Sequence, residues 1–581
     1  MPMNDLRWLV GELRALNNDL NEGDAPAPIV IALDQGGHAS RAIAFEAGGA
    51  LLAETFVPIS TFRAGADRVE HDAREIVDSI HTALADLQAA LGDAASRVVA
   101  AGLATQRSSV VCWDRKTGQP LSPVLSWQDR RNAAFVERLR ATGVGASGSR
   151  ALSPPYPPSP LGFPLVAAKR GRVKNEVVAS IPASESPASE SGPLPRKAGE
   201  GWGGGGGIES RVRERTGLVL SPHYGASKLR WCLDNIDAVR GAHDKKLLAA
   251  GPLASYLLHS LLTERPDKVD PANASRTQLW DPGLRDWSAA LLELFGVPRE
   301  VLPASVPSRH AFGHLPFAER LIPLSVCTGD QAAMPFASGE LDQDTLYLNM
   351  GTGAFLQRQH GEGRIDHPQL LRSVLWSDDE QVIEVQEGTV NGAGSAMDWL
   401  GEQLAIDAHR AARAVTWQHC EKLAPPLFVN GIAGVGSPYW LPNVAAEFIG
   451  GAMAGDLEKV VAVLESIAFM ICANLELMRD SALRRVLASG GLSASNYLCE
   501  CIASLGGLTV ERSTVREATA TGLAFLVFGR PRDWRPVLEI ETFVPRQSSS
   551  QSAALEQRYA RWRELMAASA SPPAGRPSSR R

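Results

Sequence analysis

Residues 29–46 read IVIALDQGGHASRAIAFE, with a glycine turn at the centre of two apolar runs. A run of five apolar residues leads into the turn DQGG, Asp34 to Gly37, and a second apolar segment runs from Arg41 to Glu46. Apolar runs on both sides of a glycine turn predict two strands joined tightly. A helix expected from about Asp72 to Leu91 and a strand near 98–104 continue the pattern, which is typical of an α/β domain.

A similar opening occurs again in the second part of the chain. A new series of strands and helices starts near Ser325, and the segment from Leu346 to Gly353 again joins a strand to a glycine-rich turn. Two halves that each begin with a strand and a glycine turn predict a duplicated α/β architecture around a central cleft.

The bulk composition is that of an ordinary globular protein. With 581 residues the chain is too long for one hydrophobic core, so at least two domains are expected. The formal charge of -6 and the absence of a basic block argue against a nucleic-acid partner or a membrane-surface partner. The sequence has no long uncharged apolar run that would predict a membrane span and no apolar signal core that would predict export. A cytoplasmic location is therefore expected. Seven scattered cysteines are expected to be buried, reduced thiols.

Composition also marks the boundaries of the domains. Residues 146–207 are rich in Pro, Ser and Gly and bury too little apolar surface to offset ordering entropy, so a disordered insertion is predicted. The predicted units are an N-terminal extension and linker at 1–28, a first domain at 29–330 that carries the insertion, a second domain at 331–540, and a C-terminal helix with a disordered tail at 541–581. The helix is expected from Ala553 to Ala567, and the role of the N-terminal extension stays open.

Three motifs of the first part carry residues suited to chemistry. In the turn DQGGHASR, 34–41, glycines let backbone N–H groups approach an anion, and the Asp34 carboxylate could hold a metal through water; a plain hairpin turn is the alternative. TQRS, 105–108, and SWQDRR, 126–131, combine arginine forks with an aromatic face, which suits a hydroxyl-rich ligand; surface arginines beside a tryptophan are the alternative. In TGDQ, 328–331, Asp330 could accept a hydroxyl proton during phosphoryl transfer, or could simply cap a helix.

The second part contributes three glycine turns: MGTG at 350–353, GAGS at 392–395 and SGG at 489–491. The first could surround a phosphate with backbone amides and the Thr352 hydroxyl. The other two would allow adenine and ribose to approach the backbone closely. Each turn taken singly is more often structural.

In their order along the chain these motifs resemble the FGGY carbohydrate kinases, in particular the glycerol-kinase-like branch. The resemblance covers about residues 29–142 and 211–530, and the matching blocks include ALDQGGHASRAIAF, RVEHDAREI, SWQDRR, DPANASRTQLWD, TGDQAAMPFASG, MGTGAF, NGAGSAMDWL and SGGLSASNYL. It implies two ribonuclease-H-like domains of the actin/hexokinase/Hsp70-like type around a central cleft.

The resemblance also implies roles for individual residues. Asp330 matches the catalytic base, and Asp34 matches the carboxylate near the Mg²⁺–phosphate site. The positions matching substrate contacts are Arg107, Ser108, Trp127, His223, Asp330 and Gln331. The positions matching the nucleotide site are Asp34, Gly36, Gly37, His38, Arg41, Gly351, Thr352, Gly394, Gly491 and Ser495.

At three places the chain departs from the branch it resembles. Glycerol kinases usually carry Gln-Arg-Glu where this chain has Ser108 in place of the glutamate, and they carry a tyrosine where His223 falls. In the phosphate turn, Gly37 and His38 replace hydroxyl residues. Loss of the carboxylate should cost roughly 2–4 kcal/mol in glycerol binding.

We therefore expect an enzyme that uses ATP and Mg²⁺ to phosphorylate a hydroxyl of a small polyol or sugar. Glycerol and a different polyol remain equally open as the acceptor, with ketose or tetritol kinases among the alternatives. A nucleotide-binding regulatory protein without turnover is the alternative of another class. Association of identical copies is left open.

Overall fold

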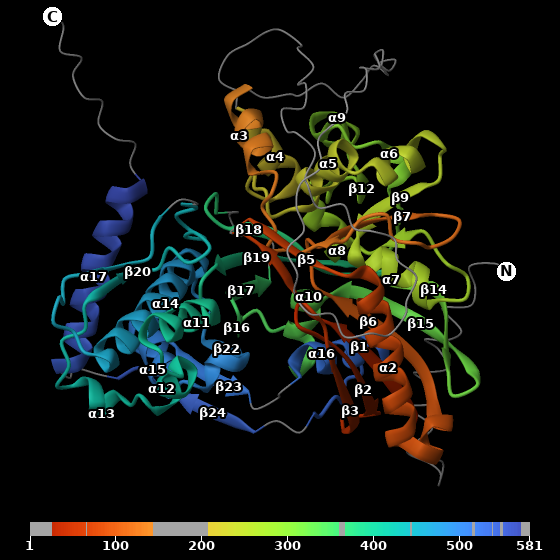
Figure 1. Cartoon of the computed structure of the whole chain (residues 1–581). Coiled ribbons are helices and arrows are strands. Elements are labelled where there is room, and N and C mark those ends of the chain that lie inside the picture. The colour runs from red at the N-terminus through yellow and green to blue at the C-terminus, as the bar shows by residue number, and fades with distance from the viewer. Residues whose placement is uncertain are drawn as a thin grey trace, which may run out of the picture.

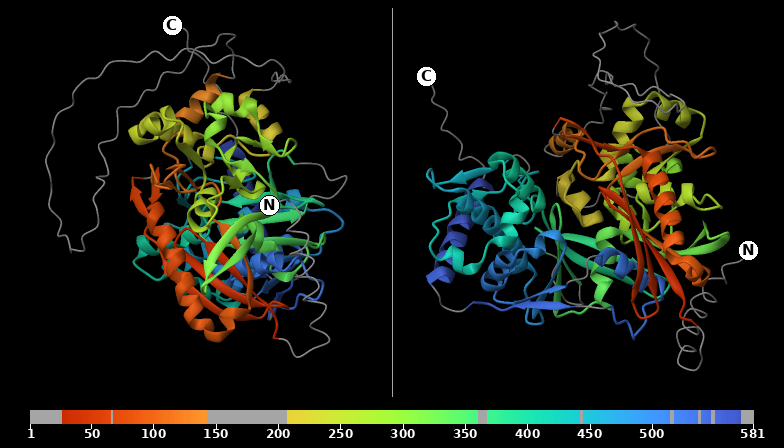
Figure 2. Two further views of the ribbon diagram at one scale, coloured as in Figure 1. Left: turned by 90° about the vertical axis from the view of Figure 1, so that its right-hand side faces the viewer. Right: turned by 60° about the horizontal axis from the view of Figure 1, so that its bottom comes forward.

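The computed structural model describes residues 26–65, 67–142, 207–359, 367–441, 444–513, 517–536, 539–546 and 550–570. Most of the predicted N-terminal extension, nearly all of the predicted insertion and the tail after residue 570 lie outside these ranges. Within them the chain forms two lobes, one built mainly from the first half and one from the second half (Figures 1 and 2).

The first lobe is built on a six-stranded sheet in the order β14-β15-β6-β1-β2-β3. β1 pairs antiparallel with β2 and parallel with β6, and β6 pairs parallel with β15. One face of the sheet is covered by α2 and α7. The bounds are β1 Ile29–Gln35, β2 Ala39–Glu46, β3 Leu51–Pro58, β6 Val98–Thr105, β14 Arg309–Phe317, β15 Arg320–Gly329, α2 Ala73–Leu91 and α7 Leu253–Leu261.

A smaller five-stranded sheet, in the order β4-β5-β8-β7-β9, stands beside the main one with a group of short helices. Its strands are β4 Phe62–Ala64, β5 Arg68–His71, β7 Val110–Asp114, β8 Val124–Leu125 and β9 Leu248–Pro252. The helices are α3 Ala133–Thr142, α4 Ile208–Thr216, α5 Gly225–Asn235, α6 Asp237–Asp244, α8 Pro271–Ala274 and α9 Ala289–Phe295. Two short strand pairs complete the lobe: β10 Lys268–Val269 with β13 Ala304–Ser305, and β11 Trp280–Asp281 with β12 Asp286–Trp287.

The second lobe repeats the topology of the first on a seven-stranded sheet, β18-β19-β17-β16-β22-β23-β24. β16 pairs antiparallel with β17 and parallel with β22, as β1 does with β2 and β6. The strands are β16 Thr345–Met350, β17 Ala354–Gln359, β18 Leu371–Ser377, β19 Val382–Val390, β22 Arg485–Ser489, β23 Thr509–Ser513 and β24 Ile540–Phe543, with β20 Leu427–Val429 and β21 Glu447–Ile449 as a separate pair. The helices of this half are α10 Asp330–Ala333, α11 Gly394–Leu404, α12 Ala408–Ala414, α13 Trp417–Cys420, α14 Asp456–Met478, α15 Asn496–Gly506, α16 Ala518–Val527 and α17 Ser550–Ala570.

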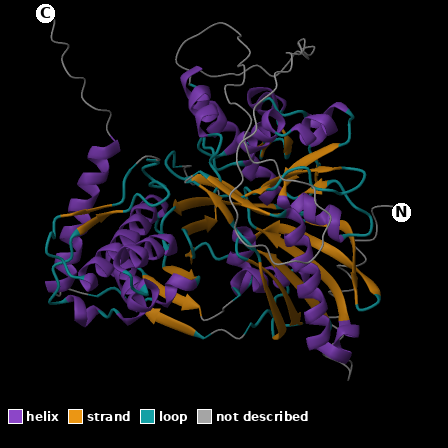
Figure 3. Cartoon of the chain, viewed as in Figure 1, coloured by secondary structure: helices purple, strands orange, loops and turns teal. Residues whose placement is uncertain are grey.

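The predicted fold class is confirmed by this repeated topology, and helices flank strands in both lobes (Figure 3). The predicted helix at 72–91 is α2, and Asp72 caps it by accepting from the Arg74 amide. All seven cysteines lie in the described ranges, and all seven are buried and free, as expected. Cys499 and Cys501 lie on the helix α15.

One helix connects the two lobes. α16 comes from the end of the chain, yet its residues pack against β1 and β6 of the first sheet (Figure 1). Gly102 of β6 makes this close approach possible, since a Cβ there would lie 2.6 Å from Val527. The N-terminal end of α16 therefore reaches the edge of the sheet where the β1–β2 turn lies.

The helix α14 is long and apolar enough to cross a membrane, but 89% of its most apolar window is buried inside the molecule. It packs against α15 and the sheet of the second lobe within a single large core. Its apolar character is accounted for by this position.

Candidate active site

The functional residues predicted for the first lobe come together because three parallel strands end at one edge of the sheet. The register places Gln35 of β1 and Gly329 of β15 opposite Thr105 of β6. Asp34, the turn after Thr105 and Asp330 therefore meet, at the edge where α/β sheets commonly bind ligands.

Asp34 sits in a cluster of opposing charges. The hairpin register sets it opposite Arg41, and their side chains approach to 3.6 Å. Arg41 also contacts Glu517, at the start of α16, at 3.3 Å. Burial, together with the nearby carboxylates of Asp330 and Glu517, raises the pKa of Asp34 to about 7 even though Arg41 opposes the shift. Three carboxylates, those of Asp34, Asp330 and Glu517, therefore lie close together near the single guanidinium of Arg41.

Asp330 is the first residue of α10, directly after β15. Its Oδ1 accepts a hydrogen bond from the neighbouring Gln331 amide at 2.7 Å, but the N-cap of α10 is Gly329 and no side chain caps this helix. Burial raises the pKa of Asp330, while Arg107 and the hydrogen bond from Gln331 oppose the shift. A carboxylate with a raised pKa is a stronger base than an exposed one, which suits proton acceptance from a hydroxyl.

Arg107 belongs to a buried charge cluster that spans the two lobes. Its Nη2 donates to Glu387 of β19 at 3.2 Å, and Arg276 pairs with the same carboxylate from the other side. Although burial alone would raise it, Arg107 and Arg276 lower the pKa of Glu387 to about 2. Within the described residues, Nη1 of Arg107 is buried without a hydrogen-bond partner. A buried guanidinium N–H without a partner is costly, and this atom is free to donate to a ligand.

Arg131 of SWQDRR is used differently from Arg107. It pairs with Asp129 and with Glu70, each at 2.6 Å, and its guanidinium lies over the Trp231 ring. Arg131 therefore has a structural role, because its guanidinium is engaged by these protein groups. The expectation that an arginine fork and an aromatic face meet a ligand therefore rests on Arg107 of TQRS and Trp127 of SWQDRR, and it stays a prediction.

Side-chain amides and hydroxyls connect the turn at 34–41 to two segments that carry predicted substrate contacts, residues 105–109 and 126–131. Gln106 donates to Gln35 at 3.2 Å and to the Gly36 carbonyl at 3.3 Å, and it accepts from Ser109 at 2.9 Å. The Ser109 hydroxyl in turn accepts from the Trp127 amide at 2.9 Å. Gly37 lies beside the Trp127 ring, and His38 is exposed at the tip of the turn.

His223 and Tyr224 lie in different environments. The ring of His223 lies 3.3 Å from the Trp127 carbonyl, and burial together with Lys228 and Arg130 lowers its pKa to about 4. Tyr224 is buried near Arg276 and Arg107, whose charges oppose the rise in its pKa that burial causes. Tyr224 thus faces the charge cluster, while His223 supports the backbone beside Trp127.

The glycine turns of the second lobe converge at the ends of β16 and β22. The Gly394 amide donates to the Gly351 carbonyl at 2.9 Å, and the Ser395 amide donates to the Thr352 carbonyl at 3.0 Å. A Cβ on Gly394 would lie 2.7 Å from the Gly351 oxygen, so only glycine fits at this point. Gly491 stands in open space behind Gly490, whose φ of 88° requires glycine.

Ser495 has a different environment from the other positions predicted for the nucleotide. It is 1% exposed, caps α15 and donates to the Ala412 carbonyl at 2.9 Å. Its hydroxyl is engaged within the protein in the manner of a capping residue.

Four residues of this arrangement had not been singled out from the sequence. Glu387, Arg276 and Glu517 stand in segments without a recognisable motif, so no local pattern identifies them. Asn349 of β16 donates to the Gln331 side chain at 3.1 Å and so connects the segment after Asp330 to the turn of the second lobe.

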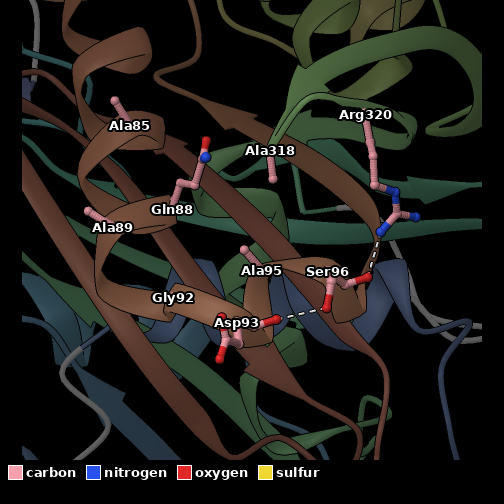
Figure 4. Close-up of a pocket in the computed structure, with 9 residues that line it drawn as sticks. All are labelled: Ala85, Gln88, Ala89, Gly92, Asp93, Ala95, Ser96, Ala318 and Arg320. Carbon is pink, nitrogen blue, oxygen red and sulfur yellow. Dashed lines mark hydrogen bonds between the residues drawn. The ribbon is translucent and has the colours of Figure 1, made fainter.

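A separate hollow of about 690 Å³ lies between the end of α2 and β15, far from this chemistry (Figure 4). Four of its nine lining residues are alanines, and Arg320 donates to the Ser96 carbonyl at 2.5 Å. None of the predicted site residues lines it.

Comparison with known families accounts for this arrangement. The N-terminal domain of the FGGY family of carbohydrate kinases matches residues 29–151 and 204–345, and the C-terminal domain of the same family matches 346–528. The chain belongs to the FGGY family of carbohydrate kinases. It is an ATP-dependent kinase acting on a small polyol or sugar, as predicted.

Curated relatives are named glycerol kinase. The protein from Geobacter sp. strain M21 is 30% identical over 506 residues, covering 86% of this chain and 89% of its own length. The protein from Trichlorobacter lovleyi is 32% identical over 516 residues, with the same two coverages.

Solved structures show the same fold with more varied names. Glycerol kinase from Plasmodium falciparum, solved with ADP, has a TM-score of 0.71 at 19% identity and covers 93% of this chain and 98% of its own. Gluconate kinase from Lactobacillus acidophilus has a TM-score of 0.69 at 15% identity and covers 94% of this chain and 99% of its own. At these identities the likeness concerns the fold alone.

Proposed function

We propose that this FGGY kinase transfers the γ-phosphoryl group of ATP to a hydroxyl held between Arg107, Trp127 and Asp330. The observation that carries the proposal is the Asp330 carboxylate, whose pKa is raised by burial, beside Arg107 with its unpartnered buried Nη1. The acceptor oxygen forms a bond to the γ-phosphorus, the bond from that phosphorus to the ADP oxygen breaks, and the hydroxyl proton moves to Asp330.

The nucleotide is proposed to lie along the glycine turns of the second lobe. Gly351, Thr352, Gly394 and Gly491 lie in the three turns that converge there, where backbone amides and the Thr352 hydroxyl can meet phosphate oxygens. The β1–β2 turn of the first lobe, with Gly36, Gly37 and Arg41, would face the γ-phosphate from the other side.

Mg²⁺ fits the Asp34 cluster. Within the described residues no group of three or more His, Cys, Asp or Glu side chains could hold a metal alone. This agrees with Mg²⁺, which keeps several waters and binds through one or two carboxylates plus substrate phosphates. The carboxylates grouped around Asp34 carry the kind of charge that a divalent cation compensates. When bound, the ion would neutralise charge on the transferring phosphoryl group.

The finer identity of the acceptor rests on Ser108 and its neighbours. Ser108 offers only a short hydroxyl where a carboxylate would bind two glycerol hydroxyls, and His223 is turned to the Trp127 backbone. Tyr224 supplies a phenol close by, through its contact with Arg276. Glycerol and a longer polyol therefore both remain candidates, and we propose the small polyols as the acceptor class.

A coupled ADP-release assay against glycerol, tetritols, pentitols, ketoses and aldonates tests the proposal. We expect Mg²⁺-dependent turnover with at least one polyol. Asp330→Asn should lower kcat by about 10²-fold or more, in line with general-base contributions, and should leave ATP binding in place. Asp379→Asn, an exposed residue of the second lobe, is the matched control. ATP binding without turnover on any acceptor would instead favour a regulatory protein.

A further inference from the structure

Lys228 is a fully buried lysine of α5, 0% exposed, in the wall behind the substrate segments. A buried ammonium group is costly unless its N–H groups are satisfied. Among the described ion pairs none gives Lys228 a carboxylate within 4.0 Å, because the nearby Asp129 is already held by Arg131. Its hydrogen bonds must therefore account for its position.

Both of its hydrogen bonds go to backbone carbonyls of the substrate segments. Nζ donates to the Ser108 carbonyl at 3.0 Å and to the Ser126 carbonyl at 2.7 Å. The first carbonyl directly follows Arg107, and the second directly precedes Trp127. One ammonium group thus joins the two segments that carry the proposed acceptor contacts.

The Ser108 backbone explains why such a contact is needed. Its φ of 64° lies in the left-handed region, which is strained for a non-glycine residue and persists only where the surrounding structure holds it. The bond from Lys228 acts on the carbonyl of this very residue. The following residue, Ser109, is held in turn by Gln106 and the Trp127 amide.

We propose that Lys228 is a positioning residue that holds Ser108 and Trp127 in the geometry which binds the acceptor, without touching acceptor or nucleotide. This inference rests on the proposed function of the same site. It assigns Lys228 to acceptor affinity and not to nucleotide affinity, since neither of its bonds reaches the second lobe.

Lys228→Met keeps the length of the side chain and removes its donors. We expect the KM for the acceptor found in the screen to rise about 10-fold or more, while the KM for ATP changes less than about twofold. Lys245→Met, the same replacement at an exposed lysine, is the matched control and should leave both constants unchanged. Equal losses for acceptor and ATP, or no loss for either, would overturn the assignment.

A second variant separates positioning from simple loss of stability. Glycine adopts a φ of 64° without strain, so in a Ser108→Gly background the rise in acceptor KM caused by Lys228→Met should shrink at least threefold. An undiminished effect would show that Lys228 does not act through the Ser108 backbone. If Lys228→Met does not fold, Lys228→Gln, which keeps a polar amide at this buried position, replaces it in the same KM measurements.

Amide hydrogen exchange provides a readout that does not require turnover. Peptides covering 106–109 and 126–128 should exchange faster in the Lys228 variant than in Lys245→Met, while β1 and β16 stay unchanged. Absence of wild-type turnover would reject the proposed function alone, and unchanged exchange in both peptides would reject the role of Lys228.

Discussion

At the scale of single residues, the site combines positions that motifs reveal with positions that only packing reveals. Asp34, Arg107 and Asp330 stand in short patterns with turn residues, so the sequence places them at strand ends. Glu387 and Arg276 lie far apart along the chain and meet only because the two lobes close on each other. A pattern search along one strand cannot find such a pair.

Residue 108 should control which acceptor is preferred. Ser108→Glu restores a carboxylate and should raise kcat/KM for glycerol about 10-fold or more, if one charge-assisted hydrogen bond of ~1.5–3 kcal/mol is regained. A bulkier native acceptor should lose activity, because the longer side chain takes its space. Steady-state kinetics of Ser108→Glu, alone and with His223→Tyr, measure both effects. Ordinary glycerol kinase efficiency in the wild type with no gain in the variant would contradict this expectation.

The raised pKa of Asp34 predicts how stability depends on pH. The folded state holds the proton up to about pH 7, whereas the unfolded residue releases it near 3.8, so folded protein binds more protons in between. Stability without ligands should therefore fall as pH rises from about 4 to 7 through this group. Asp34→Asn should raise Tm at pH 8 more than at pH 5. Thermal melts of both proteins across this range measure the difference, and an equal effect at both values would count against it.

At the scale of elements, strand and helix positions follow from the sequence far better than their contacts do. The strands around DQGG and the helix α2 fall close to their predicted places, because glycine turns and apolar periodicity are local signals. The placement of α16 against the first sheet is not local, since it depends on Gly102 and on small residues that admit the helix. The expected C-terminal helix at 553–567 is found as α17, at Ser550–Ala570.

The attachment of α17 depends on a buried ion pair that the sequence does not reveal. Arg558 donates to both oxygens of Glu465 on α14, at 2.7 and 2.6 Å, and Glu465 is 1% exposed. Tyr497 donates to the same carboxylate at 2.7 Å. The pair therefore connects α17 to the centre of the second lobe.

Removing the arginine should leave the buried Glu465 carboxylate without its cation, with only the hydrogen bond from Tyr497 remaining. Arg558→Met is expected to cost about 3–5 kcal/mol of unfolding free energy, with little change in kcat at low temperature because the site is remote. Arg561→Met, an exposed arginine on the same helix, should cost less than about 0.5 kcal/mol. Adding Glu465→Gln to Arg558→Met should recover part of the loss. Chemical denaturation of the wild type, the two single variants and the double variant measures the free energies of unfolding. Similar losses for Arg558→Met and Arg561→Met would show that the ion pair between Arg558 and Glu465 does not stabilise the protein.

At the scale of the whole molecule, the two lobes follow from duplication of one strand order. The sequence predicted this because each half opens with a strand and a glycine turn. The predicted boundaries at 330 and 540, the N-terminal extension and the insertion remain predictions. In the described structure the lobes are not formed strictly by consecutive halves of the chain, since α16, from the end of the chain, covers the first sheet.

Residues 147–207 lie almost wholly outside the described ranges, between the helices α3 and α4. The helices on either side are neighbours: Arg140 of α3 contacts Glu209 of α4 at 3.3 Å and also donates to the Leu220 carbonyl. Because the flanks pack together without the intervening chain, deletion of 147–207 should leave Tm almost unchanged.

The four residues 143–146 would then join Thr142 to Ile208 and could span up to roughly 17 Å. The loop-closure entropy of this short connection is no larger than that of the full-length segment, unless the short connection is strained. A version with four added Gly-Ser residues at the junction serves as the control for strain. Thermal melts and acceptor kinetics of full-length protein, deletion and extended deletion give the answer. A large loss of Tm in both shortened proteins would mean that the segment packs on the first lobe, whereas a loss confined to the tight junction would trace to strain in the connection.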